Sequence, residues 1–290
     1  SQIGRMPPAR SYGPYSVYTG GMKKIMTNRR DFIYTSSGLA LAAMLPGCAS
    51  SSKQGAGISP SPALIDDIPR SPYGFATTAD QVLEGMNLSK LTVLITGCNS
   101  GLGYESMKSL AGAGAHVIGA ARTREKAEEA CASVTGKTTP VVCELTDMDS
   151  VVSCANTVNG VDAPLDVLMC NAGIMAVPEL ELLEVNGRML ERQFVTNHLG
   201  HYLLTRRLLS RVTSAPQGRI VMVSSGGYML APQGGIQFDN LSGEGGYQPF
   251  KAYGQTKLAN ILMSGELSRR YFDQGISANA IAPGVVATNL

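Results

Sequence analysis

From Leu91 onward, short apolar runs alternate with longer amphipathic stretches. The runs have the length and composition of buried strands, and the stretches between them have helical spacing of their apolar residues. The predicted strands span 91–96, 116–121, 140–144, 165–171, 219–225 and 276–283. The predicted helices span 101–113, 124–134, 147–159, 188–213 and 251–274. Because parallel strands need helical crossovers, this alternation predicts a single α/β domain with a doubly wound parallel sheet.

The chain ahead of this pattern divides into three parts. Residues 22–48 combine a basic start, an apolar segment and a small-residue end, which is the order of parts in an export signal. Residues 1–21 are predicted to be an upstream or disordered segment, and the Ser-, Pro- and Gly-rich residues 49–85 are predicted to be a linker. The folded domain is therefore expected to occupy residues 86–290.

The signal-like segment has two finer features. Arg29 and Arg30 with the following Phe32 resemble a twin-arginine signal, whose pathway carries folded proteins. The sequence LPGC, which ends at Cys48, resembles a lipoprotein box with Cys48 as the lipidated residue. We therefore expect export to the periplasm, with membrane attachment through the Cys48 lipid or the apolar segment. The alternative is an N-terminal hydrophobic helix that merely anchors or packs, in a cytoplasmic protein.

The overall charge and the cysteine pattern exclude two classes of function. A formal net charge of +2 gives no electrostatic basis for binding nucleic acid. The six cysteines and three histidines show no metal-ligand spacing, so no metal site is predicted. The cysteines are expected to be small buried or turn residues.

A glycine-rich turn follows the first predicted strand, in the sequence TGCNSGLG. Glycines allow a sharp turn and close approach of the backbone to a pyrophosphate, and the N–H groups at the start of the next helix attract phosphate. The residues expected to line the phosphates are Gly97, Asn99, Ser100, Gly101, Leu102 and Gly103. A purely structural turn is the alternative, but a strand before and a helix after it favour a dinucleotide site.

The T-G-x-x-x-G-x-G spacing resembles the short-chain dehydrogenase/reductase family over roughly residues 90–290. The resemblance implies a Rossmann fold, a nicotinamide cofactor, a small-molecule substrate and frequent assembly into homo-oligomers. It also implies a final strand and much of a substrate lid that we expect to be missing from this chain.

The resemblance extends to other positions that contact the cofactor in this family. Glu144 and Leu145 stand where the family usually has Asp-Leu beside the adenine, which is a mild departure. Asn171, Ala172 and Gly173 match the N-A-G motif after the fourth strand. The loop that holds the nicotinamide carboxamide is matched by Pro283, Gly284 and Thr288.

The end of the second predicted strand bears on the choice of cofactor. An acidic side chain there would bind the adenosine ribose hydroxyls of NAD and repel a 2′-phosphate. This chain has Ala121 and Arg122 instead, and the guanidinium of Arg122 can pair with a phosphate and stack on adenine. NADP(H) is therefore expected, with NAD as the less favoured cofactor. The alternative is that Arg122 is an ordinary surface cation.

Tyr253 and Lys257 lie four residues apart on a predicted helix and hence on one face of it. A phenol with a pKa of about 10 exchanges protons poorly at neutral pH, but a neighbouring ammonium and a cationic oxidised nicotinamide favour the phenolate and lower its pKa. Ser225 ends the fifth predicted strand, at the edge where such folds bind ligands. By the resemblance, Ser225 orients the substrate, Tyr253 exchanges the proton, Lys257 binds the nicotinamide ribose, and Asn197 supports a proton relay through water.

The expected activity is an NADP-dependent interconversion of an alcohol and a carbonyl. The long connection between Ser225 and Tyr253 resembles the retinol-dehydrogenase-like and protochlorophyllide-reductase-like branches and indicates a bulky apolar substrate. Two alternatives remain open: reduction of a conjugated carbon–carbon double bond by the same residues, and a non-catalytic nucleotide-sensing or scaffold protein. His198 and His201 are expected to have structural roles rather than to bind a metal or act as acid–base groups.

Overall fold

The computed structural model describes residues 72–74, 76–284 and 286. The predictions for residues 1–21, for the signal-like segment 22–48 with Cys48, for most of the linker 49–85 and for Thr288 fall outside these residues.

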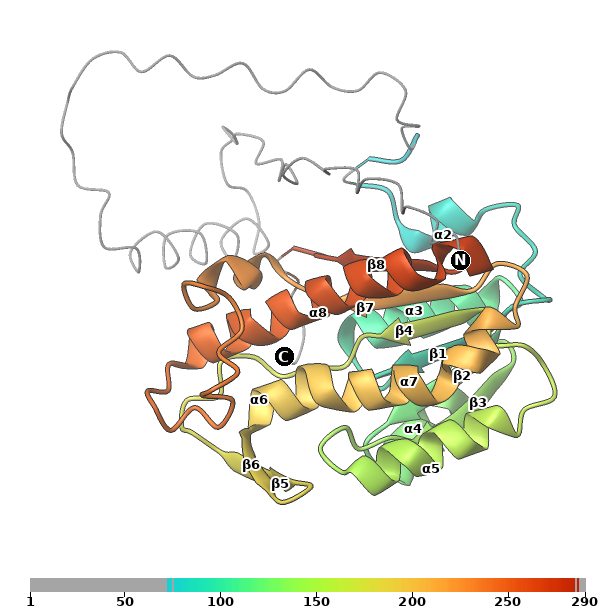
Figure 1. Cartoon of the computed structure of the whole chain (residues 1–290). Coiled ribbons are helices and arrows are strands. Elements are labelled where there is room, and N and C mark those ends of the chain that lie inside the picture. The colour runs from blue at the N-terminus through green and yellow to red at the C-terminus, as the bar shows by residue number, and fades with distance from the viewer. Residues whose placement is uncertain (1–71, 75, 285, 287–290) are drawn as a thin grey trace, which may run out of the picture. The chain divides into compact units, whose positions relative to one another are not determined.

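Six parallel strands form one sheet in the order β3-β2-β1-β4-β7-β8 (Figure 1). Their bounds are β1 Thr92–Thr96, β2 His116–Ala121, β3 Thr138–Val142, β4 Val167–Cys170, β7 Arg219–Val223 and β8 Ser277–Ile281. The strand order reverses between β1 and β4, which is the position where doubly wound sheets bind their ligands. The predicted fold class is thereby confirmed.

Helices cover both faces of the sheet, as Figure 1 shows with α5, α7 and α8 in front and α3 and α4 behind. The helices of the sheet are α3 Gly101–Gly112, α4 Arg124–Ala132, α5 Met148–Asn159, α7 Gly200–Thr213 and α8 Pro249–Tyr271. Each face has its own apolar core, in which Leu94, Leu168 and Leu204 belong to one cluster and Ile95, Val117 and Met107 to the other. Burying these side chains holds the strand ends in fixed register.

No helix in the described part of the chain combines the length and the apolar character that crossing a membrane requires. Most helices agree with the predicted ranges to within a few residues, which is the usual uncertainty of helix ends.

The predicted helix over 188–213 begins too early. Residues 182–191 form a two-stranded antiparallel hairpin, β5 Leu182–Val185 and β6 Arg188–Glu191, instead of loop and helix. Its turn is Asn186-Gly187, and both residues have positive φ angles, 51° and 75°. This dipeptide is among the strongest hairpin signals in a sequence, and it was available to predict the turn.

The helical region that follows the hairpin is irregular. It starts with α6 Arg192–Phe194, whose N–H groups are capped by the Glu191 carboxylate, and it continues through a π-helical turn, η1 Val195–Leu199, into α7. Such π turns often occur at functional sites. Asn197 lies in this turn.

A short helix, α2 Ala79–Leu83, lies within the range predicted as linker. Thr78 and Gln81 form a reciprocal capping box at its start, and Asp80 accepts a hydrogen bond from the Ser109 hydroxyl of α3. Residues 79–83 therefore pack on the domain. The Thr78 and Gln81 spacing of this capping box could have been recognised in the sequence.

All five cysteines in the described residues are free and buried. Burial raises the pKa of Cys170 to about 12, which keeps this thiol protonated at neutral pH. Their expected role as small buried residues is confirmed for these five positions.

Candidate active site

The carboxyl ends of all six strands meet at one edge of the sheet because the strands are parallel. This edge brings together the glycine turn after β1, Arg122 after β2, Asn171 after β4 and Ser225 after β7. The predicted site residues therefore share one region, although they lie far apart in the sequence.

The glycine turn is built for close packing between β1 and α3. A Cβ atom on Gly103 would lie 2.2 Å from the carbonyl oxygen of Gly97 and 2.5 Å from Nδ2 of Asn171. Gly97 and Gly101 have φ angles of 70° and 54°, which favour glycine. The turn thus presents backbone without side chains where a ligand would approach.

The start of α3 has the features of an anion site. Ser100 is its N-cap residue but makes no side-chain hydrogen bond to the N–H groups of the helix. Those groups and the positive end of the helix dipole remain available to phosphate. Asn99 is exposed, and Ser100 and Leu102 are half-buried beside it. These residues fit a dinucleotide pyrophosphate.

Asn171 and Ala172 tie the end of β4 to the end of β1. Both backbone N–H groups donate to Oγ1 of Thr96, at 2.9 and 3.0 Å, and Nδ2 of Asn171 donates to the Thr96 carbonyl at 2.8 Å. The side-chain amide of Asn171 is therefore used in shaping the glycine turn. A Cβ atom on the neighbouring Gly173 would lie 3.2 Å from Oδ1 of Asn197 and 3.5 Å from Nζ of Lys257, so this glycine adjoins the catalytic residues.

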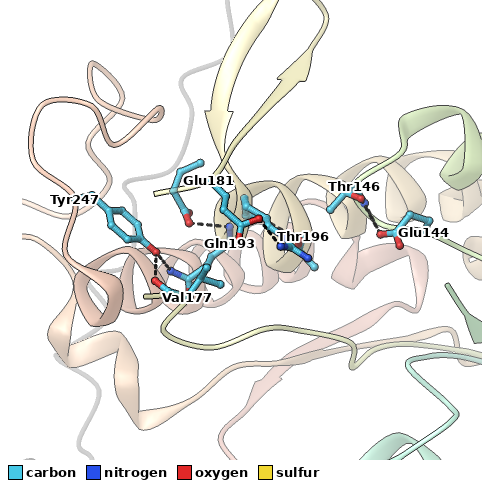
Figure 2. Close-up of polar contacts among 9 residues, drawn as sticks. Glu144, Thr146, Val177, Glu181, Gln193, Thr196 and Tyr247 are labelled. Atoms are coloured by element: carbon cyan, nitrogen blue, oxygen red, sulfur yellow. Dashed lines mark hydrogen bonds and ion pairs between the residues drawn. The ribbon is translucent and has the colours of Figure 1, made fainter. Parts of the chain in front are cut away.

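The residues predicted to surround the adenine differ in their exposure and in their contacts with other protein groups. Arg122 is exposed, and its guanidinium forms no ion pair with any residue that the structure describes. Glu144 accepts hydrogen bonds from the N–H and hydroxyl of Thr146 through one carboxylate oxygen, as Figure 2 shows. Leu145 is buried in the core, so its side chain packs the protein rather than a ligand.

The predicted catalytic pair lies on α8. Tyr253 and Lys257 are both buried, 5% and 4% exposed, and Nζ of Lys257 lies 5.4 Å from the centroid of the Tyr253 ring. The ammonium also donates a hydrogen bond of 3.1 Å to the Val223 carbonyl at the end of β7. The structure therefore places the Tyr and Lys together at the edge of the sheet.

Burial changes the pKa values of this pair. It lowers the pKa of Lys257 to about 8, because the ammonium loses water without gaining a carboxylate partner. Burial also raises the pKa of Tyr253, and a hydrogen bond with the Ser225 side chain lowers it in part. The protein's own groups thus leave the Tyr253 pKa above its ordinary value, whereas the sequence argument expected Lys257 and an oxidised nicotinamide together to lower it.

The two serines after β7 have different surroundings. Ser224 is buried, and its hydroxyl donates to the Lys257 carbonyl at 2.8 Å. Ser225 is half-exposed, and its hydroxyl accepts the N–H of Gly227 at 3.1 Å and also hydrogen-bonds the Tyr253 side chain. The structure places Ser225 beside Tyr253 and gives Ser224 a packing role, in agreement with the sequence argument.

Asn197 is fully buried, and both hydrogens of its side-chain amide and its Oδ1 bond to protein groups. Oδ1 accepts the N–H of Ile174 at 2.8 Å, and Nδ2 donates to the Ile174 carbonyl at 2.9 Å and to Oγ1 of Thr256 at 3.0 Å. The Thr256 hydroxyl in turn donates to the Tyr253 carbonyl at 2.8 Å. Asn197 therefore holds α8 and the segment after β4 together.

A second polar cluster, missed in the sequence, joins three segments near the same edge. The Tyr247 hydroxyl donates to the Val177 carbonyl at 2.6 Å and accepts Nε2 of Gln193 at 3.0 Å, and Figure 2 shows both side chains pointing at each other. Gln193 is fully buried. This contact fixes the connection between β7 and α8 against the segment after β4.

A cavity of about 260 Å³ lies beside this connection, lined by residues of 232–248 and by Lys251 and Gln255 of α8. Ser225, Tyr253 and Lys257 are not part of its lining. The predicted catalytic residues at the strand edge therefore lie outside this cavity.

Comparisons with known proteins agree with this geometry. A family model described as short chain dehydrogenase matches residues 91–290. Short-chain dehydrogenase TIC 32 B, chloroplastic, from Brassica napus is 36% identical over 233 residues, which cover 76% of this chain and 72% of the relative. Retinol dehydrogenase 14 from Homo sapiens is 39% identical over 217 residues, 69% of this chain and 62% of the relative.

Solved structures show the same fold. An uncharacterised protein from Mycobacterium paratuberculosis superposes with a TM-score of 0.61 at 39% identity, over 71% of this chain and 72% of the other. A protein from Beutenbergia cavernae, described as an NAD(P)-dependent gluconate 5-dehydrogenase and containing bound NADP, superposes with a TM-score of 0.53 at 26% identity, over 70% and 75%. With the Ser225, Tyr253 and Lys257 constellation beside a dinucleotide turn, the chain belongs to the short-chain dehydrogenase/reductase family of NAD(P)-dependent oxidoreductases.

Proposed function

We propose that this enzyme uses NADP(H) to interconvert an alcohol and a carbonyl. The observation that carries the proposal is the buried pair of Tyr253 and Lys257, with Nζ 5.4 Å from the ring centroid, at the same sheet edge as the glycine turn. A non-catalytic scaffold has no need to bury an unpaired ammonium, which costs stability.

Ser225, Tyr253 and Lys257 have separate roles in the proposed reaction. The Ser225 hydroxyl, which hydrogen-bonds Tyr253 in the absence of substrate, would donate to the substrate oxygen, and Tyr253 would give a proton to that oxygen in reduction or take it in oxidation. Lys257 contributes positive charge and binds the nicotinamide ribose. A bound nicotinamide supplies or accepts the hydride, and its oxidised form adds the positive charge that would lower the Tyr253 pKa.

NADP(H) is proposed over NAD(H) because Arg122 is exposed, carries no ion pair within the described residues and follows β2 directly. A guanidinium in this state pairs with a phosphate without breaking an existing contact.

A bulky apolar substrate is proposed from the surface beside the site. Met175 follows the Asn171–Gly173 segment, and Met229 lies in the short helix after Ser225; both are exposed, 44% and 62%. Flexible, polarisable methionines suit an apolar ligand of irregular shape. The name of the relative retinol dehydrogenase 14 is consistent with such a substrate.

The test is turnover of an apolar carbonyl panel with NADPH by wild type and by Tyr253→Phe. The variant should bind NADPH normally and lose nearly all turnover because it lacks the transferable proton. Tyr202→Phe, an exposed tyrosine on α7, is the matched control and should keep wild-type rates. Wild-type turnover in Tyr253→Phe would refute the proposal. Reduction of conjugated enones at carbon–carbon bonds alone would favour the double-bond reductase.

A separate proposal concerns the N-terminus, where the sequence supports export through Arg29 and Arg30 with lipidation of Cys48. Such a protein would fold around its cofactor before export, and the bound ligand would stabilise it in transit. Mass spectrometry of the native protein reads both the processed N-terminus and the retained nucleotide. An unmodified Cys48 in a cytosolic protein would refute export.

A further inference from the structure

A continuous chain of buried hydrogen bonds connects the glycine turn with the catalytic helix, and His201 is its central link. Nε2 of His201 lies 2.8 Å from Oγ1 of Thr96, the last residue of β1, and Nδ1 lies 3.1 Å from the Asn197 carbonyl oxygen. From Asn197 the chain continues through Thr256 to the Tyr253 carbonyl. His201, Asn197 and Thr256 are 0% exposed, so water does not compete for these bonds.

The partners of Thr96 determine which nitrogen of His201 carries the hydrogen. Oγ1 of Thr96 already accepts the N–H groups of Asn171 and Ala172, so its hydroxyl hydrogen is directed to another acceptor. Nε2 of His201 is that acceptor and must be unprotonated. The hydrogen is then on Nδ1, which donates to the Asn197 carbonyl.

The receiving carbonyl also belongs to the π turn. In this turn the Gly200 N–H bonds to the Val195 carbonyl, five residues back instead of four. The Asn197 carbonyl accepts Nδ1 of His201 and, at 3.2 Å, Nδ2 of Asn260 from α8. These two side chains link the turn to α8 and, through the imidazole, to Thr96 of β1.

We propose that His201, as the neutral Nδ1–H tautomer, is a positioning residue that couples the dinucleotide turn at Thr96 to the catalytic segment at Asn197. This inference rests on the proposed function, because the coupling holds Tyr253 in register with the cofactor. A displacement of about 1 Å in such a constellation costs up to ~100-fold in rate.

The tautomer is tested in the wild-type protein by ¹⁵N NMR of labelled histidine at pH 7, with NADPH bound. The chain contains three histidines, so single substitutions of His116 and His198 assign the signals. His201 should show a protonated Nδ1 and an unprotonated Nε2. The opposite tautomer would overturn the proposal whatever the activity of any variant.

We call the two hydrogen bonds of His201, to Thr96 and to the Asn197 carbonyl, the His201 bridge. Two substitutions each remove one of these bonds. In His201→Asn the amide nitrogen can replace Nδ1 and donate to Asn197, but Thr96 loses its acceptor. In His201→Gln the amide oxygen can replace Nε2 and accept from Thr96, but the Asn197 carbonyl loses its donor. The bridge couples the two segments only when both hydrogen bonds are present, so losing either bond should lower kcat about tenfold. His201→Leu removes both bonds and should lower kcat by about the same factor.

The dinucleotide turn keeps its bonds from Asn171 and Ala172 to Thr96 in these variants, so the Kd for NADPH should change less than about threefold. His116→Asn and His116→Gln are the matched controls, because His116 also binds a threonine, Thr139, at 2.8 Å but at the opposite edge of the sheet. These should keep kcat within about twofold.

Wild-type kcat in either His201→Asn or His201→Gln, or losses that multiply in His201→Leu, would overturn the coupling. Tyr253→Phe, measured in parallel, separates this failure from that of the proposed function: an inactive Tyr253→Phe beside fully active His201 variants refutes the coupling alone. An active Tyr253→Phe refutes the proposed function, while the NMR result still tests the bridge.

Discussion

Gly227 lies directly against the ring of Tyr253: a Cβ atom on Gly227 would stand 2.8 Å from Cε1 of the tyrosine and 3.4 Å from Oγ of Ser225. The preceding Gly226 has no described atom within 4 Å of the same position. Two adjacent glycines of one short helix therefore differ only in whether they touch the catalytic residues.

Gly227→Ala should lower kcat by about 10- to 100-fold, because the added methyl group moves the phenol away from Ser225. Gly226→Ala is the control and should keep wild-type kinetics, since neither glycine has a positive φ angle. Steady-state kinetics with NADPH and a carbonyl substrate compare them. Equal rates in the two variants would show that Gly227 does not position Tyr253.

Gly103→Ala should prevent NADPH binding and destabilise the fold by about 1–3 kcal/mol. The added Cβ would lie only 2.2 Å from the Gly97 carbonyl oxygen, and neither the glycine turn nor α3 can move aside easily. Gly112→Ala at the end of the same helix meets nothing within 4 Å among the described atoms and should be neutral or slightly stabilising. Urea unfolding and NADPH fluorescence titration measure both effects. Normal NADPH affinity in Gly103→Ala would contradict the close-packing argument.

Arg122→Gln should reduce the ratio of kcat/KM for NADPH to that for NADH by about tenfold, through loss of a charge-assisted contact to the 2′-phosphate. Arg219→Gln removes an exposed positive charge at the start of β7, on the opposite edge of the sheet, and should leave the ratio unchanged. An unchanged ratio of kcat/KM values in Arg122→Gln would indicate that Arg122 does not contact the cofactor and is an ordinary surface cation.

The parallel sheet could be predicted because burial on both faces makes its strands continuous apolar runs, such as Thr92–Thr96, which is buried throughout. The site residues could be predicted because they follow those strands directly. Both signals are local in the sequence; the sheet is confirmed, and the roles of the site residues stay predictions.

The remaining features depend on contacts between distant segments. The bridge from Thr96 through His201 to Asn197 joins residues 105 positions apart, and no spacing rule connects them. The link between Tyr247 and Val177 spans 70 positions in the same way. The π turn at Val195–Leu199 carries no sequence signature, since its residues would also fit a regular helix.

His201 should also make folding stability depend on pH. Complete burial is the largest cause of its low pKa, about 4, with smaller contributions from the positive charges of Lys257 and His198. The unfolded chain takes up a proton on this histidine near pH 6.5, whereas the folded protein does so only near pH 4. Because the unfolded state binds more protons in this window, the free energy of unfolding falls as the pH decreases through it.

The loss attributable to His201 should approach about 3 kcal/mol between pH 7 and pH 4. Urea unfolding of wild type and His201→Gln at several pH values isolates this contribution, since other groups titrate in both proteins. The difference in unfolding free energy between the two should shrink as the pH falls from 6.5 towards 4. A difference that stays constant would mean that the folded and unfolded proteins take up this proton at the same pH, and it would contradict the lowered pKa of the buried His201.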